Sequence, residues 1–147
     1  MPDVSGIEVY MSDYIKIAEW KVNPDKSCTA ELAEQYEDAL GRADISVKST
    51  MNLCIVFDEI YANISSYSKA TELTIRISKA DSFIRIEFID NGMQFDSTKV
   101  ASADITKLVE EREPGGLGIH MVRKLTDSME YEFIDNHNHL IIIKNCE

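Results

Sequence analysis

The chain has 147 residues, a length that predicts one domain with a substantial hydrophobic core. Its formal charge of -11 makes it a poor candidate for direct binding to nucleic-acid phosphates, and it favours solubility and a basic protein partner. Three cysteines, Cys28, Cys54 and Cys146, lie far apart and form no CxxC pair, which argues against a disulfide framework or a zinc site.

The first fourteen residues form an N-terminal extension to the predicted domain. They lack a basic region followed by an apolar run, which is the pattern of a secretory signal peptide. No apolar run in the chain approaches the length of a membrane span. We therefore expect a cytoplasmic protein that does not associate with a membrane.

The first half of the chain predicts one strand and two helices. Residues 15–22 alternate between apolar and polar side chains, as in a half-buried strand. In residues 29–41 apolar side chains recur every four positions and a glycine ends the pattern, which predicts a surface helix. A longer helix is predicted from about residue 46 to 67. Its core-facing stripe has four members: Leu53, Phe57, Ile60 and Ile64.

The second half predicts two hairpins separated by a loop and a helix. The expected elements are strands at 72–78 and 83–90, a loop at 96–114, a helix at 117–125, and strands at 129–134 and 139–145. Hairpins dominate over alternating strands and helices. This order predicts an α+β fold, a two-layer sandwich whose mixed, mostly antiparallel sheet carries helices on one face. The other face is expected to be exposed or to bind a partner.

The long predicted helix carries an acid and an amide one turn apart. Glu59 and Asn63 are separated by four residues, so they share a helix face. They could form the solvent edge of the helix. They could also act chemically, because an asparagine oxygen can ligate Mg²⁺ and a carboxylate can deprotonate a hydroxyl group.

A second polar group follows the strand predicted at 83–90. Alternation places Asp90 on the same face as Ile84, Ile86 and Phe88, so its carboxylate should point inward if that face packs on the helices. A buried carboxylate needs a hydrogen-bond donor, and the exocyclic amine of a purine would serve. Gly92 would let the backbone turn sharply or approach a flat ring. The alternative interpretation is an ordinary Asp-Asn-Gly turn.

Three glycines lie just before and within the first turn of the apolar helix predicted at 117–125. Gly115, Gly116 and Gly118 could present free N–H groups and the positive end of the helix dipole to an anion. They could equally form a flexible hinge. The sequence matches neither the P-loop nor the dinucleotide-binding fingerprint.

Together these residues resemble the motifs of the Bergerat-fold ATPases, which include gyrase, heat-shock chaperone and histidine kinase ATPase domains. Glu59 and Asn63 resemble the N box, Asp90 and Gly92 the Asp-x-Gly box, and Gly116 and Gly118 the Gly-x-Gly box that follows the ATP lid. The resemblance covers about residues 15 to 145. Within this superfamily the chain is most similar to the bacterial anti-sigma factor serine kinases, on the strings DEIYANISSY, DNGMQFD and LVEEREPGGLGIHMVRKL.

The resemblance implies a single ATPase domain over residues 1–147, with residues 96–114 as the ATP lid. It implies ATP and Mg²⁺ as ligands, Glu59 as general base, Asn63 as Mg²⁺ ligand and Asp90 as acceptor of the adenine amine. Gly92 would lie beneath the adenine ring. The phosphate loop would be formed by Gly115, Gly116, Leu117 and Gly118. The resemblance leaves open which basic residue of the lid contacts phosphate: Lys99, Lys107 or Arg112.

The implied function is that of a serine/threonine-protein kinase that acts as an anti-sigma factor in a partner-switching system. Such a kinase would bind a sigma factor or phosphorylate a small antagonist protein, and these kinases are usually homodimers. An alternative is an ATP-binding regulatory adaptor of the same fold with little or no kinase activity. A histidine kinase catalytic domain would need a separate phospho-acceptor partner. Family members often carry a histidine near Ser66 or Tyr67, and this chain does not.

Overall fold

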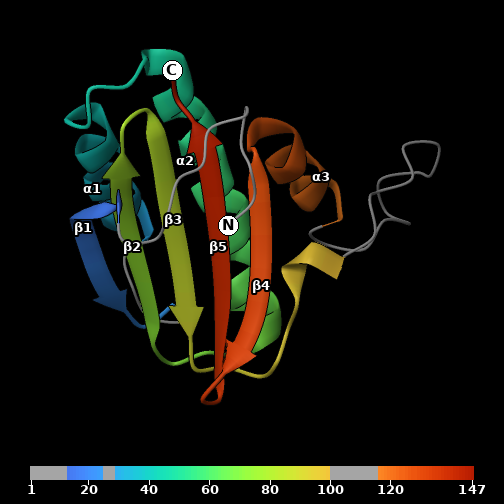
Figure 1. Ribbon diagram of the computed structural model, residues 1–147. Helices are drawn as coiled ribbons and strands as arrows, with labels where there is room; N and C mark the ends of the chain where they lie inside the picture. Colours follow the sequence, from blue (N-terminus) through green and yellow to red (C-terminus); the bar gives the residue numbers. More distant parts are fainter. Residues whose placement is uncertain (1–12, 25–28, 100–115) are drawn as a thin grey trace.

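The sheet and its helices form two layers in the computed structural model, which describes residues 13–24, 29–99 and 116–147. The sheet has five strands in the order β1-β2-β3-β5-β4 (Figure 1). Their bounds are β1 Ile15–Val22, β2 Leu73–Ala80, β3 Phe83–Asp90, β4 Ser128–Ile134 and β5 His137–Asn145. The predicted order of elements and the α+β class are confirmed.

Every strand pair is antiparallel, which is a narrower arrangement than the mixed, mostly antiparallel sheet expected from the sequence. The two hairpin turns are also tighter than predicted, because left-handed backbone at Asp81, Asp135 and Asn136 reverses the chain quickly. The flanking strands therefore gain residues that were expected in turns. One of these is Asn138, which lies in β5 opposite Asp90 of β3.

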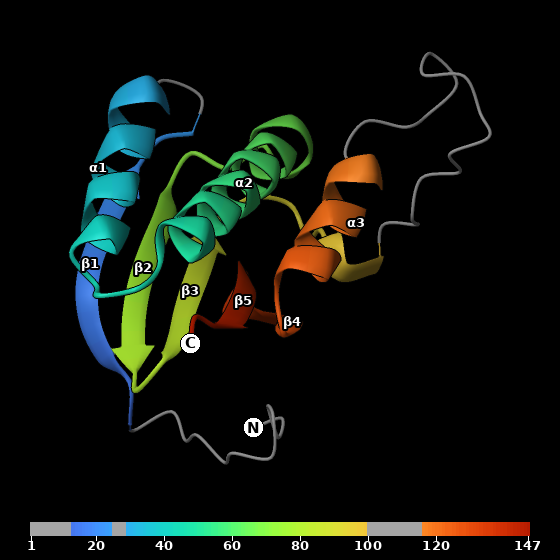
Figure 2. The same cartoon turned by 90° about the horizontal axis from the view of Figure 1, so that it is seen from above.

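Three helices cover one face of the sheet (Figure 2). They are α1 Thr29–Gly41, α2 Val47–Asn63 and α3 Gly116–Leu125. The side chain of Ser46 caps α2 by accepting a hydrogen bond from the backbone N–H of Ser49 at 3.0 Å. No helix in the described part of the chain is both long and apolar enough to cross a membrane.

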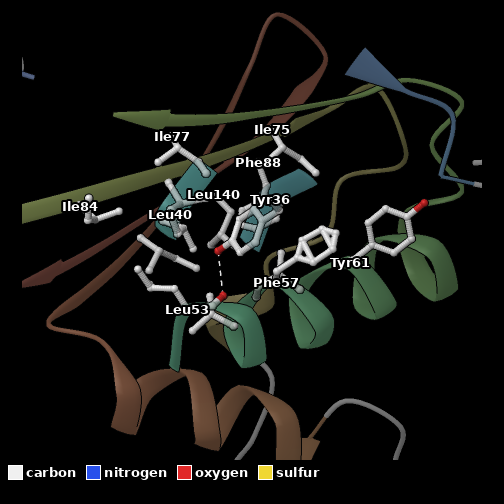
Figure 3. Close-up of a cluster of buried hydrophobic side chains, with 14 of the residues drawn as sticks. Tyr36, Leu40, Leu53, Phe57, Tyr61, Ile75, Ile77, Ile84, Phe88 and Leu140 are labelled. Atoms are coloured by element: carbon white, nitrogen blue, oxygen red, sulfur yellow. Dashed lines mark hydrogen bonds between the residues drawn. The ribbon is translucent and has the colours of Figure 1, made fainter. Parts of the chain in front are cut away.

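The hydrophobic core lies between the helices and the inward face of the sheet (Figure 3). The predicted stripe of α2 is confirmed, since Leu53, Phe57, Ile60 and Ile64 are all buried. Tyr36 of α1 is fully buried, and its hydroxyl donates a hydrogen bond to the carbonyl of Leu53 at 2.7 Å. This bond fixes α1 against α2 within an otherwise apolar layer.

The long helix ends in a different geometry from the one predicted. The α-helical pattern stops at Asn63, and Ile64–Ser68 form a π-helical turn, here called the π-turn. Lys69 then adopts left-handed backbone and ends the helix. A π-turn adds a residue to one helical turn, so it changes which side chains share a face, and such turns are frequent at functional sites. The π-turn directly follows the predicted ligand residue Asn63.

The outward face of the sheet carries polar side chains, and those on the central strand β3 are buried. Arg85 and Glu87 of β3 are both buried and form an ion pair at 3.0 Å, and Arg76 of β2 contacts Glu87 at 3.2 Å. Arg76 also bonds Glu19 of β1 at 2.7 Å, so the charged ladder crosses three strands. Buried charges require partners, and Glu87 has two arginines, although Nε of Arg85 has no hydrogen-bond partner among the described residues.

Parts of two predicted segments fall outside the described residues. Residues 1–12 of the N-terminal extension and residues 100–114 of the predicted lid are among them. The described start of the lid is a short 3₁₀ turn, Ser97–Lys99. Asp96 caps it, because its carboxylate accepts hydrogen bonds from the backbone N–H and the hydroxyl of Thr98 at 2.8 and 2.6 Å.

Candidate functional site

The predicted acid of the long helix contacts the last glycine of the predicted phosphate loop. Glu59 of α2 is half-buried, and its carboxylate lies directly against Gly118 of α3. A methyl group added to Gly118 would overlap the Glu59 carboxylate. The structure therefore brings together two motifs that are 59 positions apart in the sequence, and it gives a steric reason for glycine at position 118.

Asn63 lies one turn beyond Glu59 and is 2% exposed. Its side-chain nitrogen is buried and has no hydrogen-bond partner among the described residues. A buried donor without an acceptor is destabilising by about 1–3 kcal/mol. The amide can present its oxygen or its nitrogen to the same side by rotation about one bond. This side chain is therefore suited to a polar ligand.

Asp90 ends β3 on the core-facing side, as the strand alternation predicts, and is 3% exposed. One oxygen, Oδ1, accepts two hydrogen bonds, from the backbone N–H of Gly92 at 2.9 Å and from Nδ2 of Asn138 at 3.0 Å. Among the described residues, no donor reaches the second oxygen, Oδ2. The carboxylate thus offers one acceptor atom to a ligand.

Gly92 packs against the π-turn. A side chain at this position would overlap the backbone carbonyl of Ser68, which also accepts a hydrogen bond from the backbone N–H of Met93 at 2.7 Å. This close approach joins the loop after Asp90 to the end of the long helix. The Ser68 backbone thus explains why position 92 is a glycine. The expected place of Gly92 beneath an adenine ring stays a prediction.

Asn138 is a residue of the site that the sequence analysis missed. Besides its bond to Asp90, its Nδ2 donates to the carbonyl of Met93 at 2.8 Å. Its oxygen accepts from the backbone N–H of Phe95 at 3.0 Å and from the hydroxyl of Tyr131 at 2.5 Å. The sequence placed Asn138 in a turn. Only the pairing of β3 with β5 reveals that it faces Asp90.

An aromatic stack and a tyrosine hydroxyl lie beside the partners of Asn138. The ring of Tyr67, in the π-turn, stacks on Phe95 with centroids 5.1 Å apart. Burial raises the pKa of Tyr131, and the charges of Asp96 and Asp90 raise it further, although a hydrogen bond with Phe95 opposes them. Tyr131 therefore keeps its proton near neutral pH and acts as a donor to Asn138.

The phosphate-loop prediction lies partly outside the described residues. Gly115 is among the residues that are not described, Gly116 is the first residue of α3, and the side chain of Leu117 is not described. Of the basic lid residues, Lys99 is exposed in the 3₁₀ turn, whereas Lys107 and Arg112 lie outside the described residues. Arg123 of α3 bonds the carbonyl of Thr98, which links α3 to the start of the lid.

A metal ion would not find a complete set of protein ligands here. Within residues 13–24, 29–99 and 116–147, no cluster of three or more His, Cys, Asp or Glu side chains could hold one. Mg²⁺ in nucleotide sites takes most of its ligands from phosphates and water, so one protein oxygen is compatible with it. Asn63 would fill that single role with its side-chain oxygen, and its nitrogen, which has no partner among the described residues, leaves the amide free to turn.

Comparison with known proteins agrees with this geometry. Residues 22–144 match the histidine kinase-like ATPase domain. The serine/threonine-protein kinase BtrW of Bordetella bronchiseptica is 28% identical over 102 residues, which are 65% of this chain and 69% of BtrW.

A solved structure shares the fold. It is the crystal structure of the RsbU and RsbW domains of Rv1364c from Mycobacterium tuberculosis, with a TM-score of 0.60 and 11% identity. The match covers 87% of this chain and 31% of that one, so the present chain spans about a third of it. Because the family match extends over most of the sequence, the chain belongs to the histidine kinase-like ATPase domain family.

Proposed function

We propose that the protein is an ATP-dependent serine/threonine-protein kinase that acts as an anti-sigma factor in a partner-switching system and phosphorylates a small antagonist. The observation that carries the proposal is the Glu59–Gly118 contact next to Asn63, whose buried side-chain nitrogen has no partner among the described residues. It joins an acid, a ligand side chain and a helix N-terminus in one place. The name of BtrW, a serine/threonine-protein kinase, supports the same reaction.

In this proposal each residue has one task. Oδ2 of Asp90 accepts a hydrogen bond from the amine of adenine, because it is the carboxylate oxygen that no described protein donor reaches. The N-terminus of α3, preceded by Gly115, holds phosphate through backbone N–H groups and the positive end of the helix dipole. Asn63 ligates Mg²⁺, which neutralises phosphate charge when it is bound.

Glu59 is the proposed general base. The γ-phosphoryl group of ATP moves to the hydroxyl oxygen of a serine or threonine, the hydroxyl proton moves to Glu59, and ADP leaves. Phosphoryl transfer depends mainly on positioning and charge neutralisation, which this set of residues supplies in kind. The contact with Gly118 would keep the carboxylate beside the helix N-terminus.

The proposed partners are a sigma factor and an antagonist protein with an acceptor serine or threonine. The formal charge of -11 favours association with a basic protein surface. We further propose a homodimer in the cytoplasm, as in the kinases that the sequence resembles.

The second candidate is an ATP-binding adaptor with little or no kinase activity. It is favoured by the packing of Glu59 against Gly118, because this contact gives the carboxylate a structural role that requires no catalysis. Both candidates use the same nucleotide site, so ATP binding alone does not separate them.

Phosphate transfer to a cognate antagonist protein separates the two candidates. The measurement follows labelled phosphate from ATP to the antagonist in wild type, Glu59→Ala and Glu59→Gln. We expect transfer by wild type, a loss of at least about 100-fold in both Glu59 variants and near-normal ATP affinity, since general bases typically contribute 10²–10⁴-fold. Glu34→Gln, at an exposed acid of α1, is the matched control and should transfer normally.

The outcomes are distinct. Wild type that binds ATP but transfers no phosphate to any cognate antagonist would establish the adaptor. Full transfer by Glu59→Gln would remove Glu59 from the role of base.

A further inference from the structure

The side-chain amide of Asn138 is fully used by the protein itself. It has two donor hydrogens and an oxygen with two acceptor sites. The four bonds described above engage all of them, and the residue is only 4% exposed. A buried network in which every group is satisfied is rigid. Asn138 is therefore held in one orientation before any ligand arrives.

The partners of Asn138 also decide which end of the amide faces Asp90. The backbone N–H of Phe95 can only donate, so it must face the amide oxygen, and the carbonyl of Met93 can only accept, so it must face the nitrogen. The nitrogen then necessarily donates to Oδ1 of Asp90. A rotated amide would lose these bonds and place its oxygen against a carboxylate.

This fixed donor leaves Asp90 with an asymmetric carboxylate. Two N–H groups engage Oδ1, and no described donor reaches Oδ2. A carboxylate oxygen without an internal donor can accept a hydrogen bond from the exocyclic amine of adenine. It repels the carbonyl oxygen that guanine and hypoxanthine carry at the same ring position. Without Asn138, only the Gly92 bond would hold the carboxylate, and it could turn to offer either oxygen.

We propose that Asn138 is a positioning residue that sets base selectivity: its Nδ2 holds Oδ1 of Asp90 so that only Oδ2 meets the base, which selects an exocyclic amine over a carbonyl. This inference rests on the proposed assignment of Asp90 to adenine. It goes beyond that assignment, because it makes the discrimination depend on a residue that does not itself contact the base.

A purely structural role is the competing explanation, since Asn138 also tethers Met93 and Phe95. The two explanations differ in what they predict for inosine triphosphate. This nucleotide has the shape of ATP but carries a carbonyl in place of the amine. If Asn138 only maintained structure, its loss would weaken the binding of both nucleotides by the same factor. If it positions Asp90, its loss would change the ratio of the two affinities.

The test compares the dissociation constants of ATP and inosine triphosphate in wild type, Asn138→Asp and Asn138→Ala. Asn138→Asp keeps the size of the side chain but replaces the donor with an acceptor. We expect wild type to prefer ATP by about tenfold or more, since an unpaired buried acceptor is costly. Both variants should lose most of this preference, with ATP binding weakened by about tenfold or more.

Two controls separate local effects from selectivity. Tyr131→Phe removes one bond to the Asn138 oxygen but leaves both of its donors in place, so the preference for ATP should survive. Asn145→Ala lies on the same strand, where its oxygen accepts from Ser82 and from the backbone of Glu147, away from Asp90. It should lower stability without changing either dissociation constant.

The results discriminate between the claims. If wild type does not prefer ATP, the adenine assignment fails. If wild type prefers ATP and Asn138→Asp keeps the same preference, the positioning role fails and the assignment stands.

A measurement on wild type covers the case in which neither Asn138 variant folds. The two side-chain amide protons of Asn138 should exchange slowly with solvent in the nucleotide-free protein, because both are hydrogen-bonded. Rapid exchange of these protons would overturn the proposal.

Discussion

A side chain is sterically excluded at two glycines of the candidate site, for different physical reasons. At Gly92 the obstacle is the backbone of Ser68, which cannot move without disturbing the π-turn. At Gly118 the obstacle is the end of a flexible side chain, that of Glu59. A side chain at position 92 would therefore destabilise the fold, whereas one at position 118 would mainly displace the carboxylate of Glu59.

The pair Gly92→Ala and Gly118→Ala tests this difference. We expect Gly92→Ala to lower the free energy of unfolding by about 1–3 kcal/mol, as overpacking does. Gly118→Ala should cost less stability but should displace Glu59 and reduce phosphate transfer. Urea denaturation and the phosphate-transfer assay measure the two effects. Equal losses of stability in both variants, with transfer intact in Gly118→Ala, would contradict the account.

Some residues of the candidate site can be predicted from local sequence patterns, and others cannot. The positions of Glu59, Asn63 and Asp90 were predictable because helix and strand periods give the facing of a side chain from local spacing, whereas their proposed roles came from the family resemblance. Asn138 was not, because its role depends on the pairing of β3 with β5, which no local pattern specifies. Predicting it would have required the strand order and the two-residue turn at Asp135 and Asn136.

At the scale of elements, the order of strands and helices was predictable and the end of the long helix was not. The apolar stripe of α2 continues through Ile64, so its period gives no sign of the π-turn. The cause is tertiary, since Ser68 must meet the loop at Gly92 and Met93. The outward face of the sheet was expected to be exposed or to bind a partner, and no local pattern gave the ion pair of Arg85 and Glu87 that is buried on β3.

The charged ladder makes one element, the edge strand β1, sensitive to pH. A hydrogen bond from Arg76 is the main cause that lowers the pKa of Glu19; burial opposes it, and the charges of Arg76 and of two lysines lower the pKa further. The ionised form is thus favoured in the folded state. Its contribution to stability is fully present above the ordinary value of 4.5 and is lost as the pH falls through the lowered folded value.

The prediction concerns Glu19→Gln. We expect wild type to be more stable than this variant at pH 7, with the difference shrinking below pH 4.5 and vanishing in stronger acid. Urea denaturation at a series of pH values measures it. In an Arg76→Gln background the pH dependence of the same substitution should be much smaller, because the main group that lowers the pKa of Glu19 is gone and only Lys16 and Lys21 remain. A difference that grows toward acid would contradict the assignment.

At the scale of the whole molecule, the fold gathers three sequence motifs at one end of the helical layer. The packing of α2 against α3 brings Glu59 to Gly118, and the π-turn brings the long helix to the loop after Asp90. All three motifs lie within residues 22–144, the part of the chain that matches the histidine kinase-like ATPase domain. The acidic charge of the molecule concerns its solubility and partners rather than the nucleotide.

The central claim is that Asp90 binds adenine, and an ATP titration of wild type against Asp90→Asn tests it most directly. The substituted amide would either lose the acceptor or turn a donor toward the adenine amine, so we expect ATP affinity to fall by about tenfold or more, equivalent to about 1.4 kcal/mol. Asp81→Asn, at the opposite end of β3, is the matched control and should bind normally. Equal affinities of wild type and Asp90→Asn would contradict the account.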